Sequence, residues 1–572
     1  MSEHPTHSAQ HHASKFTHHQ RTIALVVVAM AFVMDLLDNT IVNIAIPSIR
    51  ADLGASYSTI QWLIAGYALS FATLLITGGR MGDVYGYKRL FLIGVGGFTF
   101  ASLLSGAAWS SEVLIIARLL QGAMAALMVP QVMSLMQVMY KPKERGPIMG
   151  IFGALAGVAA SLGPVVGGIL IHFNIAGLEW RPIFLINIPV GLAVLYFAGR
   201  FLPEGKSPHP LKLDIVGTIL IMVAMFLLVF PLIEGRELDW PTWIFVMMAS
   251  SIPVLFLFGW WQGVKEKKDG SPLVVPALLR IKTFITGLIV NITFEGAMIG
   301  FFLPFTLLLQ IGLGYDVIKA ALTGIPTAVG ISVTMAVFSQ KLIPILGRYT
   351  LVLGTFLMGL GLGVLFWFLH TYGADTTPWQ FIPGLLLTGA GMALIMAPMF
   401  SVVLADVDPK NAGSASGVLN AVQQLGGAIG TALIGVVFFG HLVSNAPASF
   451  TSVEPQTRSS LASANIPEPA INTIVDQAQT CYVDRAQQKD ETQTPASCQA
   501  LTSGGQQGNV PQATSDAIQS TLTTAAKDAN AKNFISAFGV AIVFELIILG
   551  IVFGLSFLLP RHIRPESMEQ AI

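Results

Sequence analysis

The chain has 572 residues, of which 53% are hydrophobic and 11% are charged. Its mean hydropathy is +0.69, which is typical of a membrane protein rather than of a soluble domain. The formal net charge is zero and no basic stripe is evident, so nucleic acid is not an expected partner.

Fourteen apolar runs follow one another along the chain, and each is long enough to cross a bilayer core, which takes about 20 helical residues. Eight of the expected membrane helices lie at 22–46, 58–78, 90–108, 112–137, 148–172, 181–201, 213–233 and 242–262. The other six lie at 284–310, 318–338, 346–368, 379–402, 412–440 and 533–558. These runs predict an all-α membrane protein with 14 transmembrane helices.

The basic residues gather in alternate loops. If the N-terminus lies in the cytoplasm, the loops on that side contain most of the Lys and Arg residues. The opposite short loops contain only Arg50, Arg181, Arg236 and Lys319. Because short loops rich in Lys and Arg stay on the cytoplasmic side, we expect a multi-pass protein of the cell membrane with both termini cytoplasmic.

An even number of crossings places the polar segment 441–532 outside, and this segment contains both cysteines, Cys481 and Cys498. An oxidising compartment favours a disulfide between them, and two free thiols in a flexible loop are the alternative. The Ser, Thr, Gln and Ala content of the segment fits either a disordered loop or a small helical cap. In the His-rich tail at 1–21 metal binding is conceivable, but we expect a solvated tail and no metal site.

Two carboxylates, Asp35 and Asp38, lie one helical turn apart in the first apolar run. Together with Asn39 and Asn43 they fall within roughly 140° of a helical wheel. Two carboxylates this close in a low-dielectric site do not both ionise cheaply. A carboxylate that changes its ionisation there can carry a proton, or release it when a cation binds. A hydrogen-bonded helix-packing cluster is the alternative.

Arg118 is the basic residue expected near the middle of the membrane, in the run 112–137. An Arg at a helix centre costs roughly 2.5–3.5 kcal/mol on insertion scales, so we expect it to face protein or a watery cavity. Gln121 and Gly122 follow at i+3 and i+4, which places an amide and a close-packing gap on the same helix face. A structural ion pair with no part in transport is the alternative.

Glu295, in the run 284–310, is the best acidic candidate of the second half of the chain. Glu545 is weaker, because we expect the helix 533–558 to be peripheral. Aromatic side chains such as Trp62, Tyr67 and Phe302 could stack on a lipophilic cation, although aromatic residues in membrane helices mostly pack or face lipid.

Several motifs resemble those of the major facilitator superfamily. GGRMGDVYGYKR resembles its motif A, with Val84 and Tyr87 in place of the usual basic residues, and RLLQGAMAA resembles motif B. GPVVGG resembles motif C, which is associated with antiporters, while LDNTIVNIAIP and WRPIFLINIPVG resemble motifs of fourteen-helix drug:proton antiporters. The resemblance implies gating roles for Gly79, Asp83, Gly86, Lys88, Arg89, Gly163, Pro164, Gly167 and Gly168.

The resemblance also implies a major facilitator fold with two six-helix bundles. The first bundle would span 22–201, and the second would combine 284–440 with 533–558. Residues 202–283 would hold two inserted helices with their linkers, and 559–572 would form a cytoplasmic tail.

The function implied by the resemblance is export of lipophilic, often cationic drugs in exchange for protons, without enzyme activity or a cofactor. Expected proton-coupling residues are Asp35, Asp38, Arg118 and Glu295. Expected substrate contacts are Asp38, Asn43, Trp62, Tyr67, Gln121, Glu295, Phe302, Asn420, Gln423 and Gln424. The expected partners are a small drug-like molecule, protons and the lipid bilayer; we expect a monomer and leave an adaptor protein open.

Two other transport functions and one non-transport function stay open. The chain could export a single metabolite, siderophore or antibiotic, or form the inner-membrane part of a multipartite efflux system. A membrane receptor or scaffold is the non-transport alternative, which the expected buried ionisable groups disfavour.

Overall fold

The computed structural model describes residues 18–140, 142–208, 210–408, 411–488, 494–499 and 512–561. Residues 1–17 of the predicted His-rich tail and 562–572 of the predicted C-terminal tail therefore lie outside the described residues. Within the described ranges the regular secondary structure is helical, with no strand. Thirteen helical segments of this part of the chain are long and apolar enough to cross a membrane, and α6 supplies the remaining predicted crossing.

The first six crossings are made by seven helices. These are α2 (His18–Leu53), α3 (Tyr57–Tyr85), α4 (Tyr87–Gly106), α5 (Ser111–Met139), α6 (Pro142–His172), α7 (Pro182–Leu185) and α8 (Asn187–Phe201). A short 3-10 turn, η1 (Ile175–Gly177), precedes α7, which together with α8 forms a single crossing. The inserted pair consists of α9 (Ile215–Glu234) and α10 (Thr242–Asp269), and η2 (Pro276–Arg280) leads into the second half.

The second half begins with α11 (Lys282–Leu307), which continues into a π-helical turn, η3 (Leu308–Gly312). The next crossing is divided into α12 (Val317–Thr323), α13 (Ile325–Val333), η4 (Thr334–Ser339) and α14 (Gln340–Leu346). The remaining elements are α15 (Tyr349–Tyr372), η5 (Gly373–Asp375), α16 (Pro378–Val403), α17 (Ala412–Thr451), α18 (Glu454–Ser463), α19 (Glu468–Gln487) and α21 (Gln512–Ser556).

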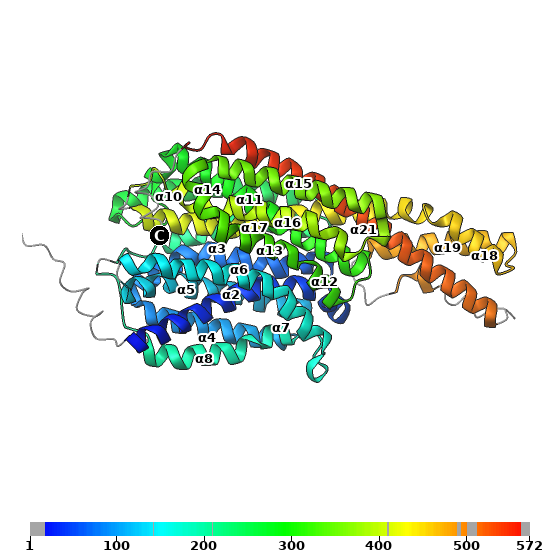
Figure 1. The fold of residues 1–572 in the computed structure, drawn as a ribbon, viewed down its shortest axis with the longest axis horizontal. Helices are drawn as coiled ribbons and strands as arrows, with labels where there is room; N and C mark the ends of the chain where they lie inside the picture. The colour runs from blue at the N-terminus through cyan, green and yellow to red at the C-terminus, as the bar shows by residue number, and fades with distance from the viewer. Residues whose placement is uncertain are drawn as a thin grey trace, which may run out of the picture.

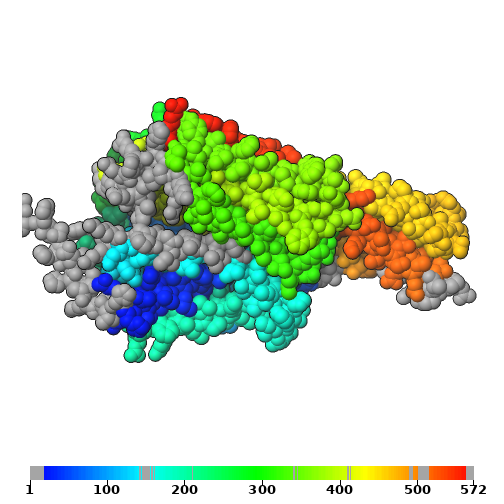
Figure 2. Space-filling model, in the orientation of Figure 1, coloured from blue at the N-terminus to red at the C-terminus, as the bar shows by residue number. Residues whose placement is uncertain are grey.

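The long helices run roughly side by side, with the first half of the chain along one side of the molecule and the second half along the other (Figure 1). The start of α2 and the end of α21 lie at the same end of the molecule, which we call the termini end. Helices α18 and α19 project at the opposite end, which we call the cap end (Figures 1 and 2).

The two halves of the chain meet along α3 and α17, from Gly417 beside Ile76 to Gly435 beside Gln61, and they have further contacts near the cap end. The rings of Tyr57 (α3) and Phe439 (α17) stack with their centroids 4.1 Å apart. Gln310 Nε2 of η3 donates to the Ile44 carbonyl oxygen of α2 at 3.1 Å. The last two contacts lie near the cap end. Ile44 and Phe439 are in the later parts of α2 and α17, and both helices run from the termini end toward the cap end.

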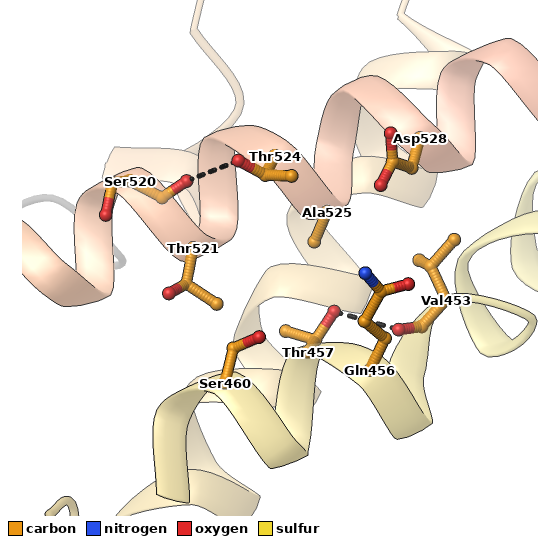
Figure 3. Close-up of a pocket in the computed structure, with 9 residues that line it drawn as sticks. All are labelled: Val453, Gln456, Thr457, Ser460, Ser520, Thr521, Thr524, Ala525 and Asp528. Carbon is orange, nitrogen blue, oxygen red and sulfur yellow. Dashed lines mark hydrogen bonds between the residues drawn. The ribbon is translucent and has the colours of Figure 1, made fainter. Parts of the chain in front are cut away.

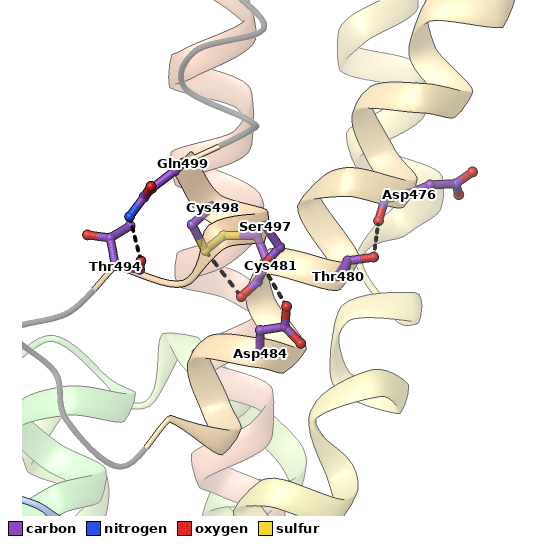
Figure 4. The surroundings of a disulfide bond; sticks show 8 residues. All are labelled: Asp476, Thr480, Cys481, Asp484, Thr494, Ser497, Cys498 and Gln499. Atoms are coloured by element: carbon purple, nitrogen blue, oxygen red, sulfur yellow. Dashed lines mark hydrogen bonds between the residues drawn. A yellow bond between two sulfur atoms is a disulfide. The ribbon is translucent and has the colours of Figure 1, made fainter.

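The sequence left either a disordered loop or a small helical cap open for segment 441–532, and its described residues are mostly helical. Helix α17 continues to Thr451 and α21 begins at Gln512, earlier than the predicted start of its membrane run, so the helical-cap alternative holds for the described residues. Cys481 and Cys498 are joined by a disulfide (Figure 4). The cap has an apolar core of its own, made of Phe450, Val453, Leu461, Ile466, Ile471, Val475, Ala478, Ala525 and Ala529.

A small groove of about 160 Å³ lies between α18 and the first part of α21 (Figure 3). Hydroxyl groups line most of it, but several of them bond to their own helices. Thr457 donates to the Val453 carbonyl oxygen at 2.9 Å, and Thr524 donates to the Ser520 carbonyl oxygen at 2.9 Å. The groove is therefore a consequence of helix packing in the cap.

Candidate functional site

Asp38 lies at the centre of a buried hydrogen-bond network. Its Oδ2 atom accepts a bond from Arg118 Nη1 of α5 at 2.5 Å. Its Oδ1 atom accepts bonds from the side-chain amides of Gln121 (α5) and Asn187 (α8), each at 2.7 Å. Both amides also donate to the Ser102 hydroxyl of α4, at 2.9 and 3.2 Å. One carboxylate therefore ties α2 to α5 and α8, and Ser102 adds α4.

Arg118 is enclosed by protein, with 1% of its surface exposed. Its Nε atom donates to the Leu63 carbonyl oxygen of α3 at 3.1 Å, and its Nη1 atom also donates to Gln121 Oε1 at 2.8 Å. The guanidinium carbon lies 4.4 Å from the centre of the Tyr67 ring, which is a cation–π contact. The expectation that Arg118 faces protein rather than lipid is confirmed.

Asp35 joins the same network through Tyr67. The Tyr67 hydroxyl donates to Asp35 Oδ1, and both residues are buried. Asp38 thus contacts the guanidinium directly, while Asp35 reaches it through the aromatic ring. If both carboxylates are ionised, two negative charges face one positive charge and the network carries a net charge of about −1, which is expensive in a protein interior.

A second acidic group lies in the other half of the chain. Glu295 of α11 is 7% exposed, and its Oε1 atom accepts a bond from Gln423 Nε2 of α17 at 3.3 Å. Gly426 allows α17 to approach at this point, because a Cβ atom there would lie 2.7 Å from the Ile292 carbonyl oxygen. The structure therefore brings Glu295 and Gln423 together, as neighbours on two packed helices.

Other predicted substrate contacts are dispersed. Asn420 donates to the Ser416 carbonyl oxygen of its own helix at 3.1 Å. Trp62 donates from Nε1 to Glu234 Oε1 of α9 at 2.7 Å, which ties it to the inserted pair rather than to the Asp38 network. Tyr67 and Gln121 are fully buried inside that network, whereas Asn43, Phe302 and Gln424 are partly exposed.

The motif A segment forms the sharp connection between α3 and α4. Gly86 has a φ of 100°, a conformation that favours glycine, and its N–H donates to the Gly82 carbonyl oxygen at 2.8 Å. Tyr87 stands where the motif has a basic residue, and its hydroxyl donates to Asp83 Oδ1 at 3.0 Å. Lys88 Nζ lies 3.5 Å from Glu204 Oε1, whereas Arg89 is exposed.

The tightest helix contact of motif A involves a glycine beside the predicted one. A Cβ atom on Gly79 would lie 3.6 Å from Pro130 Cβ, an ordinary contact, whereas one on Gly78 would collide with the Ala126 carbonyl oxygen of α5. Gly82 is equally tight, because the Gln131 side chain fills the space beside it and donates to the Gly78 carbonyl oxygen at 2.9 Å.

The motif C glycines of α6 face two different helices. Cβ atoms on Gly163 and Gly167 would crowd α2, the first against Thr40 and the second at 2.7 Å from Ile44 Cγ2. A Cβ atom on Gly168 would lie 3.0 Å from Ala321 Cβ of α12, in the other half of the chain. Helix α6, which is continuous through Pro164, therefore lies between the two halves.

Several residues of these contacts were absent from the predicted site. Ser102 and Gln131 carry no recognisable signal, since single polar residues are common in apolar helices. Asn187 had a signal, because it lies in the WRPIFLINIPVG motif, but the sequence did not connect it with Asp38. Among the described residues, no group of three or more His, Cys, Asp or Glu residues is arranged to hold a metal ion.

The model of the Major Facilitator Superfamily matches residues 28–431. The chain belongs to this superfamily. The probable actinorhodin transporter of Streptomyces coelicolor is 40% identical over 552 residues, which cover 96% of this chain and 93% of the relative. The puromycin resistance protein pur8 of Streptomyces alboniger is 33% identical over 424 residues, which cover 74% and 82%.

A solved structure supports the major facilitator fold. The crystal structure of a bacterial homolog of the human lysosomal transporter Spinster, in an inward-facing and unoccupied conformation, has a TM-score of 0.56 to this chain. The two share 16% sequence identity, and the match covers 95% of this chain and 98% of the other. The predicted major facilitator fold is thus confirmed, and the protein is a multi-pass membrane protein.

Proposed function

We propose that this protein is a proton-coupled exporter of lipophilic, antibiotic-like molecules across the cell membrane. Two relatives support the export of such molecules: one is named as a transporter of actinorhodin and the other as a puromycin resistance protein. We infer proton coupling from the Asp38–Arg118 network and not from the names of the relatives.

The charge balance of the network supports a proton-binding role. Asp35, Asp38 and Arg118 are all buried, and two carboxylates outnumber one guanidinium. One added proton therefore makes the network neutral. Because Asp38 holds α2 against α5 and α8 through three hydrogen bonds, a proton on this carboxylate removes an acceptor site and weakens these helix contacts.

The substrate would bind between the two halves, with Glu295 and Gln423 as its polar contacts in the second half. A lipophilic cation suits this place, since Glu295 is a buried acid whose hydrogen-bond partner is a neutral amide. Proton binding at the Asp38 network and substrate binding at Glu295 would then oppose each other through the switch in access. Each lowers the affinity for the other, which is exchange by thermodynamic linkage.

The bundles would switch access by rocking where α6 of the first half lies against α12 of the second half. Gly163, Gly167 and Gly168 have no side chains where α6 faces its neighbours. Neighbouring helices can therefore shift along it without meeting side chains of α6 at these positions. In this scheme the termini end faces the cytoplasm and the cap end faces outside, in agreement with the distribution of basic residues.

The test uses purified protein in proteoliposomes, with ethidium and puromycin as probes. We expect a pH gradient to drive accumulation of at least one probe. Asp38→Asn should abolish this accumulation and the release of protons when the probe is added to detergent-purified protein. Unchanged proton release in Asp38→Asn would show that this carboxylate is not the coupling group.

Loss of folding must be separated from loss of coupling. Removing one partner of a buried ion pair costs about 3–5 kcal/mol, because the other charge stays buried and unpaired. The double variant Asp38→Asn with Arg118→Met removes both charges and should recover most of the thermal stability while remaining uncoupled. Gradient-driven accumulation by this double variant would contradict the proposal.

A dedicated antibiotic exporter is the second candidate, and the names of both relatives favour it. The same assay separates it from a multidrug exporter. Transport of puromycin alone indicates a narrow antibiotic exporter, whereas transport of both probes indicates a broad specificity for lipophilic cations.

A further inference from the structure

Glu545 of α21 is a buried acid that the Asp38 network and the Glu295 site do not use. Its side chain is 1% exposed, and neither carboxylate oxygen has a hydrogen-bond partner among the described residues. The sequence predicted a peripheral helix here, and one face of α21 is exposed, as at Ile547 and Ile551. Glu545 lies on the opposite side, where α21 packs against α11, α15 and α17.

Gly300 of α11 provides the space for the carboxyl group. A Cβ atom on Gly300 would lie only 2.6 Å from Glu545 Oε1 and 3.5 Å from Ile434 Cβ of α17. The neighbouring buried side chains of α21 are apolar, namely Ala541, Ile542 and Leu549. The acid is therefore seated in a notch between three helices, among groups that cannot solvate a charge.

No charged partner accompanies Glu545 among the groups that the structure describes. On α11 the nearest titratable group along the chain is Glu295, five residues before Gly300, which is about 7.5 Å along the axis and about 140° around the helix. On α17 it is His441, whose Nε2 atom lies 2.9 Å from Ser536 Oγ. The titratable residues of α15, Tyr349, His370 and Tyr372, lie at the ends of that helix.

An ionised carboxylate without a partner is very costly in such surroundings, so Glu545 holds a proton in this conformation. A group whose only purpose is packing would be apolar. We propose that Glu545 is a second proton-binding residue of the transport cycle, placed in the contact between α21 and α11. It lies on a different face of α11 from Glu295, about 140° around the helix.

The step itself is the binding and release of one proton by the Glu545 carboxylate. Release requires α11 to shift against α21, so that the carboxylate reaches water or a hydrogen-bond donor. Because α11 also carries Glu295, a shift of α11 would connect the two acids without direct contact. This inference rests on the proposed proton coupling.

The experiment compares Glu545→Gln with the wild type in proteoliposomes, using ethidium and puromycin. Each coupled proton contributes a factor of about ten to the final accumulation ratio per unit of pH gradient. Glu545→Gln should therefore lower that ratio about tenfold at a gradient of about one unit. Exchange of labelled for unlabelled probe at equal pH should stay unchanged. Glu112→Gln, which alters an exposed acid at the start of α5, should match the wild type in both assays.

The outcomes separate this inference from the proposed function. If the wild type accumulates neither probe under a gradient, the proposed function fails and this inference fails with it. If the wild type is coupled, Asp38→Asn is not, and Glu545→Gln equals the wild type, only the role of Glu545 is overturned.

A second variant keeps the inference testable if Glu545→Gln folds poorly. Glu545→Asp keeps the acid but shortens the side chain, so it should retain the accumulation ratio while shifting the pH profile of the transport rate. An unchanged pH profile, or a lost ratio in a folded Glu545→Asp protein, would overturn the inference.

Discussion

At the scale of single residues, buried polar groups divide into those that are satisfied by partners and those that are not. Asp38 accepts three side-chain hydrogen bonds, whereas Glu545 accepts none among the described residues. A satisfied ionic network fixes how helices meet, because each member depends on the others. A buried acid without a hydrogen-bond partner is expected where the acid gains and loses a proton during function.

Asp214 is a satisfied acid outside the membrane crossings, and it gives a pH prediction. It caps α9 by accepting from the Gly217 N–H at 2.9 Å, and it also accepts from Trp261 Nε1 at 2.8 Å and from Gln262 Nε2 at 2.9 Å. Burial alone would raise the pKa of Asp214, but the hydrogen bonds from these residues outweigh it and hold the pKa below its ordinary value.

The sign of the effect follows from this lowered pKa. The stabilisation from Asp214 is fully present above the unfolded-state pKa of about 3.9 and is lost as the pH falls through the lower folded-state value. Asp214→Asn should therefore lower the stability at pH 7 by about 1–3 kcal/mol, with a smaller deficit below about pH 4. Thermal unfolding in detergent across a pH series measures this, with the exposed Glu179→Gln as the control. An equal deficit at both ends of the series would contradict it.

At the scale of elements, glycines set how closely helices approach. Gly296 of α11 faces Gly430 of α17 so closely that a Cβ atom on Gly430 would collide with the Gly296 backbone. Contacts of this kind allow backbones to meet where lipid offers no hydrophobic drive for association. They also hold Glu295 beside Gln423, since both contacts belong to the same helix pair.

Gly430→Ala should destabilise the protein, because the added methyl group meets backbone atoms that cannot move aside. Overpacking of this type costs typically 1–3 kcal/mol. Gly440→Ala is a matched control on the same helix, since a Cβ atom there has no neighbour within 4 Å, and it should be neutral or stabilising by up to about 1 kcal/mol. Thermal unfolding in detergent measures the stability of both variants. Equal changes in stability would show that the close approach at Gly430 does not limit the size of the side chain there.

At the scale of the whole molecule, the two halves of the chain meet along α3 and α17 and also through several contacts near the cap end. These include the Tyr57–Phe439 stack, the hydrogen bond from Gln310 to Ile44 and the approach of Gly168 to Ala321. If transport requires rocking, these contacts must separate once per cycle. Contacts within one half need not separate.

Cysteine pairs test this difference. Gly168→Cys with Ala321→Cys joins the two halves, and Thr99→Cys with Gly191→Cys joins α4 to α8 within the first half. In both cases the Cβ atom built on the glycine lies 3.0 Å from the partner Cβ atom. Oxidation should stop transport by the first pair, reversibly on reduction, and leave the second pair active in proteoliposomes. Undiminished transport with the first pair fully cross-linked would exclude rocking at this contact.

The sequence predicted the fold well where the signal is local. The length of each apolar run predicts a crossing, because a bilayer core requires a fixed helical length. Prediction failed at segment ends and at remote contacts. Helices α17 and α21 extend beyond their apolar runs into a polar cap, where hydropathy gives no membrane signal.

What the sequence alone determined is the number of crossings, the helices that carry acids, and a few of the close-packing glycines, namely Gly122, Gly163, Gly167 and Gly168. These are properties of single segments, so local composition is enough to reveal them. Only the tertiary structure decided that Asp38 meets Asn187, which is 149 positions away, and that Glu545 is enclosed between α11 and α17. Such pairings depend on the angle and depth at which separate helices pack, and many side chains contribute to those quantities at once.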